Sequence, residues 1–316
     1  MNRTLKCEKY LNECIDSGWI SSDGPFVSLF EKKLATYFNR KFAIAVSNGT
    51  VAVDLAVESL NLKRGDEIIL PSFTIISCIG SILRNGLVPI FIDQEKDTWN
   101  MDVTEIEKSI SERTKAIMIV HIYGLPVDVD PILELSRKYN LKIIEDSADT
   151  LGAKIGKRTT GSYSDISITS FYGSHVISCA GNGGMLLTDN KKVYEKAKIL
   201  RSWGRMSSLI KDSENIKKRL DIKLKGFEFD KKFVFSEVGY NFEPSEIGAA
   251  FGLVQLKKFD SFSKIRVKNF NAHKSFFENY KDLFITPRVL AKVKTNFLAY
   301  PVIIKQNSYF NRKDLQ

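Results

Sequence analysis

The feature that most constrains the fold is a regular alternation of short apolar runs with helical patterns between Lys41 and Leu200. Strands that alternate with helices form a mostly parallel sheet, which helices cover on both faces. The sequence therefore predicts an α/β fold. The predicted strands are Phe42–Val46, Glu67–Leu70, Val88–Asp93, Ala116–His121, Lys142–Glu145, Ile166–Ser170 and Met185–Thr188.

Several helices and one insertion can be placed along the chain. Apolar residues at helical spacing predict a helix over Val51–Leu60, and the same pattern resumes from Ser245. Asp102, a capping residue followed three positions later by Glu105, predicts another helix start. The polar, lysine-rich segment Met206–Lys232 predicts a long surface insertion.

The C-terminal region predicts a small second domain. The apolar stretch Asn296–Ile304 predicts its first strand, and a helix is expected to begin at Asn311. Because the sequence ends at Gln316, we expect this domain to be incomplete and the edge of its strand to be unpaired and prone to aggregation. We expect an N-terminal segment of residues 1–25, a large domain of residues 26–245 and a partial α+β domain of residues 246–316.

Composition argues against several classes of protein. The chain has 316 residues and no run of about 18 apolar residues, so we expect no membrane span. Its N-terminus lacks the apolar stretch of a signal peptide, and we expect a cytoplasmic protein. None of the four cysteines shows C-x-x-C spacing, which gives no support for a metal site. The net charge is +10, but the lysines are spread over expected helices without a nucleic-acid module, so we expect no nucleic-acid partner.

A first candidate site is the segment Ser47–Thr50, which follows a predicted strand and precedes a predicted helix. Backbone N–H groups at a helix start bind anions, and Gly49 allows a close approach. The segment is therefore a candidate anion site. The alternative is an ordinary connection in which Ser47 or Asn48 caps the helix.

A second candidate site is the acidic end of a predicted strand, where Glu145, Asp146 and Asp149 occur. Ligands of parallel sheets bind at the carboxyl edge of the strands, so these carboxylates are placed to meet one. The alternative is that an aspartate caps the next helix.

Two further segments carry candidate polar groups. The first runs from Ser170 to His175, ahead of a glycine-rich stretch at 181–184. A histidine can move a proton near neutral pH, although a lone histidine is more often structural. The second, Glu237–Phe242, contains Asn241, which could equally support a turn before the next helix.

Taken together and in this order, the four segments resemble the DegT/DnrJ/EryC1/StrS family of sugar-modifying enzymes, from about Gly18 to the end. The resemblance implies aminotransferase fold type I with pyridoxal 5′-phosphate (PLP) as cofactor. It implies that Gly49, Thr50 and Ser170 bind the cofactor phosphate, and that Asn241 reaches the phosphate of the neighbouring subunit in a homodimer. It also implies that residues 1–25 include a loop that contacts the substrate.

The resemblance also assigns the acidic and basic groups. Asp146 would hold the protonated pyridine nitrogen, and Asp149 stands where aminotransferases of the family usually have glutamine. His175 occupies the place of the lysine that forms a Schiff base with PLP, and its distance of 29 residues from Asp146 (175 − 146) agrees with the family. Ile75 replaces an aromatic residue that usually stacks on the pyridine ring, a role for which Phe73 is the candidate substitute.

A histidine at position 175 points to the 3-dehydratase branch, most nearly the enzymes acting on GDP-linked 4-keto-6-deoxymannose. These use pyridoxamine 5′-phosphate (PMP), formed from PLP with glutamate as amino donor, to remove the C3 hydroxyl of a nucleotide-linked 4-keto-6-deoxy sugar in dideoxysugar and lipopolysaccharide O-antigen biosynthesis. Ser202–Arg205 also resembles this branch, and the cysteine-free stretch Met206–Phe242 argues against its iron–sulfur members. Two alternatives stay open: a sugar aminotransferase, which would need a lysine at position 175, and an inactive relative.

Overall fold

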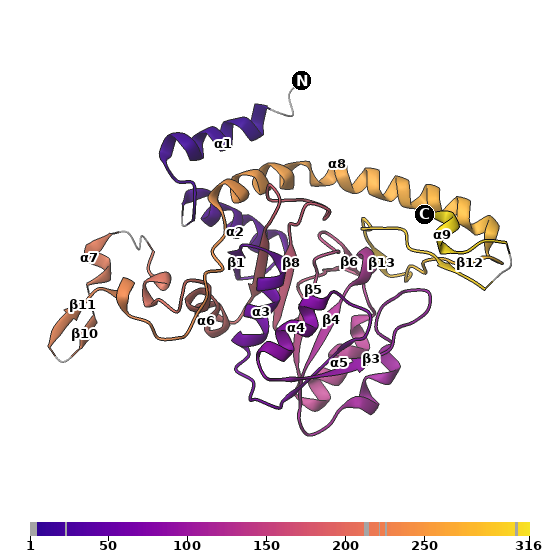
Figure 1. Ribbon diagram of the computed structural model, residues 1–316, viewed down its shortest axis with the longest axis horizontal. Coiled ribbons are helices and arrows are strands. Elements are labelled where there is room, and N and C mark those ends of the chain that lie inside the picture. The colour runs from indigo at the N-terminus through magenta and orange to yellow at the C-terminus, as the bar shows by residue number, and fades with distance from the viewer. Residues whose placement is uncertain (1–4, 23, 212–214, 221, 225, 307–308) are drawn as a thin grey trace.

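The computed structural model describes residues 5–22, 24–211, 215–220, 222–224, 226–306 and 309–316, and a seven-stranded sheet lies at its centre (Figure 1). The strand order is β1-β9-β8-β5-β4-β2-β3, and within this sheet only β9 runs antiparallel to its neighbours. All seven predicted strands are present, and their bounds agree to within two residues. The strands are β1 Phe42–Val46, β2 Glu67–Pro71, β3 Val88–Ile92, β4 Thr114–Val120, β5 Lys142–Asp146, β8 Ile166–Ser170 and β9 Gly184–Thr188.

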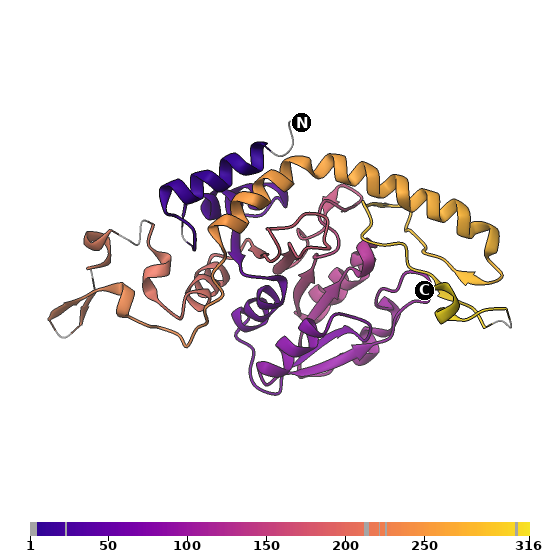
Figure 2. The ribbon, with the colours of Figure 1, turned by 45° about the horizontal axis from the view of Figure 1, so that its top comes forward.

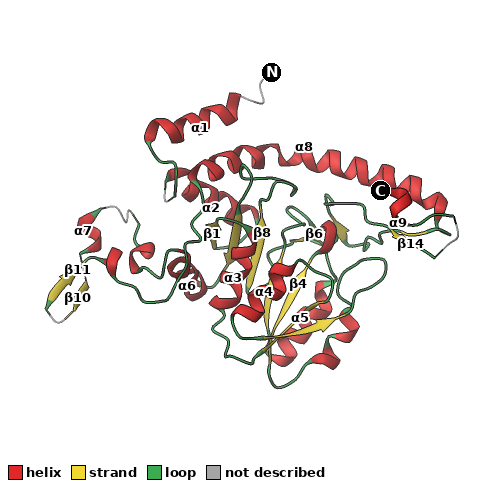
Figure 3. Cartoon of the chain, in the orientation of Figure 1, coloured by secondary structure: helices red, strands yellow, loops and turns green. Residues whose placement is uncertain are grey.

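Helices cover both faces of this sheet, as predicted (Figure 3). One face packs with α3, α4 and α6, and the other packs with α2 and α8 at the β1–β9 end and with α5 at the β4–β5 end. Because successive side chains of a strand point to opposite faces, a strand covered on both sides is buried at nearly every position, as Ile166–Ser170 is. The helices are α1 Leu5–Ser17, α2 Pro25–Tyr37, α3 Gly49–Ser59, α4 Ile76–Arg84, α5 Val129–Tyr139, α6 Lys191–Arg201, α7 Ile216–Arg219, α8 Glu246–Phe277 and α9 Arg312–Leu315.

Helix α8 links the sheet domain to the C-terminal elements (Figure 2). It begins after its capping residue Ser245, as predicted, and runs for 32 residues. The buried carboxylate of Glu246 accepts the backbone N–H groups of Phe26 and Val27 and thereby caps α2. None of the helices in the described part of the chain is both long and apolar enough to cross a membrane.

The stretch Asn296–Ile304 is not the single strand that the sequence predicts. Phe297 has a left-handed φ of 51°, and its buried ring stacks on Phe270 of α8. Only Ile303–Ile304 forms a strand, β14, which pairs antiparallel with β12, Phe284–Ile285. The expected unpaired apolar strand is therefore absent from the described residues, because its apolar part packs on α8 and its short strand has a partner.

Three smaller features complete the fold. A three-stranded sheet joins β6 Lys154–Ile155, β7 Arg158–Thr159 and β13 Val293–Lys294, so that the C-terminal region is paired with the large domain. The helix predicted after Asp102 consists of two 3-10 turns, Val103–Glu105 and Glu107–Ser109. Of the predicted insertion, residues 212–214, 221 and 225 lie outside the described residues, and the rest includes a projecting hairpin of β10 Ile222–Leu224 and β11 Phe227–Phe229.

Candidate active site

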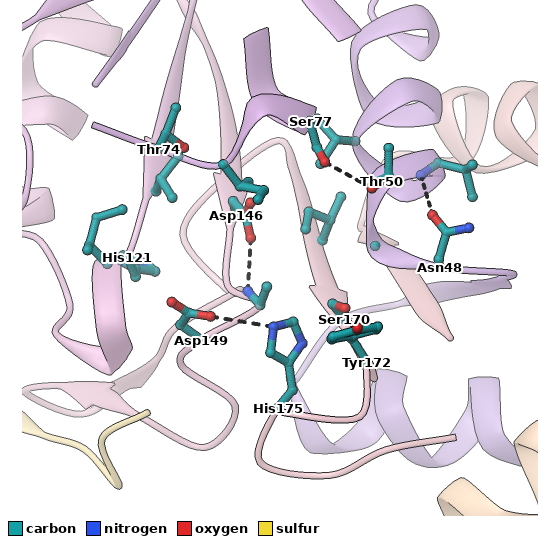
Figure 4. A pocket seen from close by; sticks show the side chains of 18 of the residues that line it. Asn48, Thr50, Thr74, Ser77, His121, Asp146, Asp149, Ser170, Tyr172 and His175 are labelled. Atoms are coloured by element: carbon teal, nitrogen blue, oxygen red, sulfur yellow. Dashed lines mark hydrogen bonds and ion pairs between the residues drawn. The ribbon is translucent and has the colours of Figure 1, made fainter. Parts of the chain in front are cut away.

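A cavity of about 800 Å³ opens at the carboxyl edge of the sheet, where β1, β4, β5 and β8 end and α3 begins (Figure 4). This is the edge at which open α/β sheets bind ligands. The structure brings six of the seven predicted site residues to its lining: Gly49, Thr50, Asp146, Asp149, Ser170 and His175. Asn241, the seventh, does not line it.

One end of the cavity presents hydroxyl groups and helix N-termini. Asn48 caps α3 by accepting a backbone N–H group of its first turn at 3.1 Å. The Thr50 Oγ1 atom lies 2.9 Å from the Ser77 Oγ atom of α4, so two helix starts converge here. A Cβ atom on Gly49 would lie only 2.7 Å from the Cβ atom of Ser170, which explains the glycine. The capping interpretation is confirmed for Asn48, and the anion site at this helix start stays a prediction.

Asp146 lies at the end of β5 with its carboxylate buried at the cavity. Its Oδ1 atom accepts the Ala148 N–H group at 2.9 Å, and its Oδ2 atom lies 3.6 Å from the Cys78 Sγ atom. Burial raises the pKa of Asp146 to about 6; the Ala148 N–H group opposes this rise and the neighbouring Asp149 adds to it. Burial also raises the pKa of Cys78 well above its usual range, so the thiol keeps its proton and can donate to Asp146. Sequence reasoning missed Cys78.

Glu145, the other acid at this strand end, serves the structure rather than the cavity. Its fully buried carboxylate accepts from His121 Nε2 at 2.9 Å, Gly161 N at 2.6 Å and Ser164 Oγ at 3.1 Å. The Val127 N–H group donates to His121 Nδ1 at 3.2 Å, so the ring proton of this imidazole is on Nε2, which donates to Glu145. A buried carboxylate satisfied by three donors fixes the strand end that carries Asp146.

His175 and Asp149 face each other across the cavity (Figure 4). The His175 Nε2 atom lies 3.7 Å from Asp149 Oδ1, while Asp149 Oδ2 accepts the Tyr123 N–H group at 3.0 Å. Burial raises the pKa of Asp149, and His175, followed by the Tyr123 N–H group, limits that rise. The buried Nδ1 atom of His175 has no hydrogen-bond partner within the described structure. The arrangement is that of a proton-transferring group with a carboxylate beside it.

The rest of the lining is largely apolar. Ile75 lines the cavity and is 60% exposed, and the rings of Phe73 and Tyr123 lie 6.0 Å apart on the same lining. Two aromatic side chains therefore line the same cavity as Ile75. No lysine is among the described residues that line the cavity.

Asn241 lies beside the site and outside its lining. It is exposed and forms an isolated bridge with Ser202. The carbonyl of the next residue, Phe242, accepts the Ser47 N–H group at 3.0 Å, which connects this segment to the start of the segment Ser47–Thr50. Its predicted role across a subunit boundary stays a prediction.

The sheet and the position of the cavity define the class of fold-type I aminotransferases. The structure of Escherichia coli GDP-4-keto-6-deoxy-D-mannose-3-dehydratase with bound hydrated PLP is similar, with a TM-score of 0.86 and 28% identity over 98% of this chain and 79% of that chain. Residues 4–316 match the DegT/DnrJ/EryC1/StrS aminotransferase family, and the chain belongs to this family.

Named relatives fall into two kinds. GDP-perosamine synthases from Escherichia coli O157:H7 and Caulobacter vibrioides are 37% and 38% identical to this chain, over 90% and 79% of its length. A dTDP-4-dehydro-2,6-dideoxy-D-glucose 3-dehydratase from Saccharopolyspora spinosa is 31% identical over 90% of its length. The matched region spans 73%, 62% and 64% of these three relatives, respectively.

The cavity fits PLP, the cofactor that the family uses. The start of α3 at Gly49 packs closely on Ser170 and lies beside the Thr50 and Ser77 hydroxyls, which are groups suited to a phosphate. Asp146 offers a buried carboxylate to a ring nitrogen. These residues could hold the phosphate and the pyridine ring.

Proposed function

We propose that this protein is a PMP-dependent 3-dehydratase that removes the C3 hydroxyl of a nucleotide-linked 4-keto-6-deoxyhexose. The observation that carries the proposal is the pairing of His175 with Asp149 in a cavity whose described lining contains no lysine. Without a lysine, the enzyme has no amine to recapture the cofactor covalently. The structural similarity to a 3-dehydratase supports the same assignment.

The residues of this chain divide the work. Thr50, Ser77 and the N-terminus of α3 bind the phosphate, and Asp146 keeps the pyridine nitrogen protonated. When bound, the cofactor supplies an electron sink for the carbon next to its ring. His175 Nε2 takes and returns the proton, and Asp149 orients the imidazole and stabilises its charged form.

The overall chemistry has a definite stoichiometry. Each turnover would consume one glutamate and release one 2-oxoglutarate, one ammonia and one 3,6-dideoxy-4-keto sugar, since the amino group of glutamate leaves as the ammonia. The C3 hydroxyl leaves after protonation, and His175 is the group placed to protonate it.

The second candidate is a PLP-dependent nucleotide-sugar aminotransferase. The identity to GDP-perosamine synthases, 37% over 90% of this chain in one case, favours it. An aminotransferase would transfer the amino group to the sugar and release no ammonia. His175 would then have to carry protons without forming the covalent link that a lysine forms.

The two candidates differ in their products, so one experiment separates them. Purified protein is incubated with PLP, glutamate and a GDP- or CDP-linked 4-keto-6-deoxy sugar, and the product mass and the ammonia are measured. We expect a deoxygenated keto sugar and ammonia from the wild type and neither from His175→Asn, which should still bind PLP. An amino sugar without ammonia would establish the aminotransferase, and no product from any substrate would favour an inactive relative.

Assembly is part of the proposal. Asn241 would complete the phosphate site of a second copy, so PLP retention should depend on a homodimer. Sedimentation analysis of wild type and Asn241→Ala, with PLP content measured alongside, tests this. A monomer that retains PLP as tightly as the dimer would contradict it.

A further inference from the structure

A strained turn lies beside the cavity at Tyr123–Gly124. Tyr123 has φ 56° and ψ 20°, a left-handed conformation that is unfavourable for a non-glycine residue. Gly124 has φ 83°, and a Cβ atom on it would lie 2.3 Å from the Leu298 N atom. Such a conformation persists only where the surrounding structure fixes it, and it often marks a functional constraint.

The peptide groups of Tyr123 connect the cavity to the C-terminal region. On the cavity side, the Tyr123 N–H group donates to Asp149 Oδ2 at 3.0 Å, and Asp149 Oδ1 lies 3.7 Å from His175 Nε2. On the far side, the Tyr123 carbonyl accepts the N–H groups of Leu298 at 2.9 Å and Ala299 at 3.3 Å. One residue therefore contacts both the carboxylate that faces His175 and the segment 295–299.

The segment 295–299 is itself held from two sides. Arg266 of α8 donates from Nη1 to the carbonyls of Phe297 at 3.2 Å and Leu298 at 3.0 Å. The buried hydroxyl of Thr295 donates to the Gly124 carbonyl at 2.6 Å. The Phe297 ring stacks on Phe270, which anchors the segment on α8.

We propose that residues 295–299, fixed on α8 by Arg266, form a positioning clamp that holds the Tyr123–Gly124 turn so that Asp149 stays in reach of His175. Arg266 and Thr295 are positioning residues in this scheme, since neither lines the cavity. The inference rests on the proposed function only in taking His175 as the group that moves the proton.

The test compares Arg266→Ala with a matched control, Arg288→Ala. Arg288 ties the C-terminal region to the large domain, through Glu95 at 2.7 Å and Asp97 at 2.8 Å. Its guanidinium therefore bonds these two carboxylates and not the Tyr123–Gly124 turn. Both variants remove an arginine that holds part of the C-terminal region in place, Arg266 on α8 and Arg288 on the large domain, so an effect specific to Arg266 reports on the clamp.

The first readout needs no cofactor. The chain has three histidines, so the ring signals of His175 can be assigned in a nitrogen NMR spectrum of the cofactor-free dimer by comparison with His175→Asn. We expect these signals to move in Arg266→Ala and to keep their wild-type positions in Arg288→Ala. The second readout is turnover: kcat of Arg266→Ala should fall by about tenfold with KM for the sugar nearly unchanged.

Unchanged His175 signals in Arg266→Ala, or equal changes in both variants, would overturn the clamp. If Arg266→Ala does not fold, the isosteric variant Thr295→Val replaces it. Its His175 signals and its kcat are then compared with those of Arg288→Ala in the same way. Failure of the proposed function looks different. In that case His175→Asn retains native turnover, while the NMR comparison still decides whether the clamp positions Asp149.

Discussion

Replacing Asp146 with asparagine is expected to stabilise the cofactor-free protein at neutral pH while removing its activity. The carboxylate is buried at the cavity and receives one N–H group, from Ala148, and one thiol, from Cys78. This is little compensation for the lost hydration of a charge. Asparagine keeps the oxygen that Ala148 needs and carries no charge.

The magnitude follows from linkage between ionisation and folding. The pKa of Asp146 is raised from its ordinary value of 3.8 to about 6, so between these values the folded state binds more protons than the unfolded state. The free energy of unfolding therefore falls as the pH rises through this window, by about 3 kcal/mol in all, since each pKa unit is worth about 1.4 kcal/mol. Below about pH 4 the group has no such effect, and above about pH 6 the loss is complete.

The assay is urea unfolding of wild type and Asp146→Asn between pH 4 and pH 8, without cofactor and at one protein concentration. We expect the free energy of unfolding of the variant to exceed that of the wild type by a margin that grows with rising pH and reaches about 3 kcal/mol at pH 7. Saturating PLP should reduce this difference in the free energy of unfolding. Only the wild type offers a carboxylate to the ring nitrogen, so the cofactor stabilises the wild type more. A variant that is equally or less stable at pH 7, or whose advantage grows toward acid pH, would refute the reasoning.

Three further substitutions probe other parts of the site. His175→Lys should form an adduct with PLP at position 175 that borohydride reduction makes permanent. Peptide mass mapping of the reduced wild type should find no such adduct. An adduct on any lysine of the wild type would overturn the assignment of position 175 to the place of the cofactor lysine. Gly49→Ala should lower the affinity for PLP at least about tenfold in a spectral titration, because the alanine Cβ atom would lie 2.7 Å from the Cβ atom of Ser170. An unchanged affinity would argue against a phosphate at this turn. Glu145→Gln should lower the free energy of unfolding by about 2–4 kcal/mol, since an amide cannot accept from all three donors. A change under about 0.5 kcal/mol would show that this carboxylate is not needed for stability.

Local patterns predicted most of the fold because several central strands are short, largely apolar and covered on both faces. Strands such as β2 and β4 are buried along almost their whole length and consist mostly of apolar residues, so their composition indicates them. The stretch Asn296–Ile304 is equally apolar and misled the same reasoning. There the apolar character serves packing on α8, and Phe297 adopts a left-handed backbone that no apolar pattern indicates.

The motifs predicted which residues lie together at the cavity, as for Asp146 and His175, while the roles of these residues stay predictions. The motifs did not predict contacts that depend on tertiary structure. Cys78 meets Asp146 across 68 residues of sequence. The hydrogen bond from the Leu298 N–H group to the Tyr123 carbonyl joins segments 175 residues apart (298 − 123), and no local property of either residue predicts it.

Under the proposed function, the two carboxylates of the cavity explain how a histidine can serve at the position where, by the resemblance, most relatives have a lysine. Burial raises the pKa of both Asp146 and Asp149, but their partners differ. Asp146 has only a neutral N–H group and a thiol, so it is the one left to gain from a cationic ring nitrogen. Asp149 is already opposed by His175 and fixed by the Tyr123 N–H group, so its charge serves the imidazole. Pairs of acids whose surroundings set them apart in this way take different roles in catalysis. Under the proposed function, Asp146 therefore keeps the cofactor nitrogen protonated and Asp149 stabilises the charged form of the base, His175. A lysine at position 175 would place a primary amine opposite Asp149, and Asp149 would then no longer serve an imidazole base.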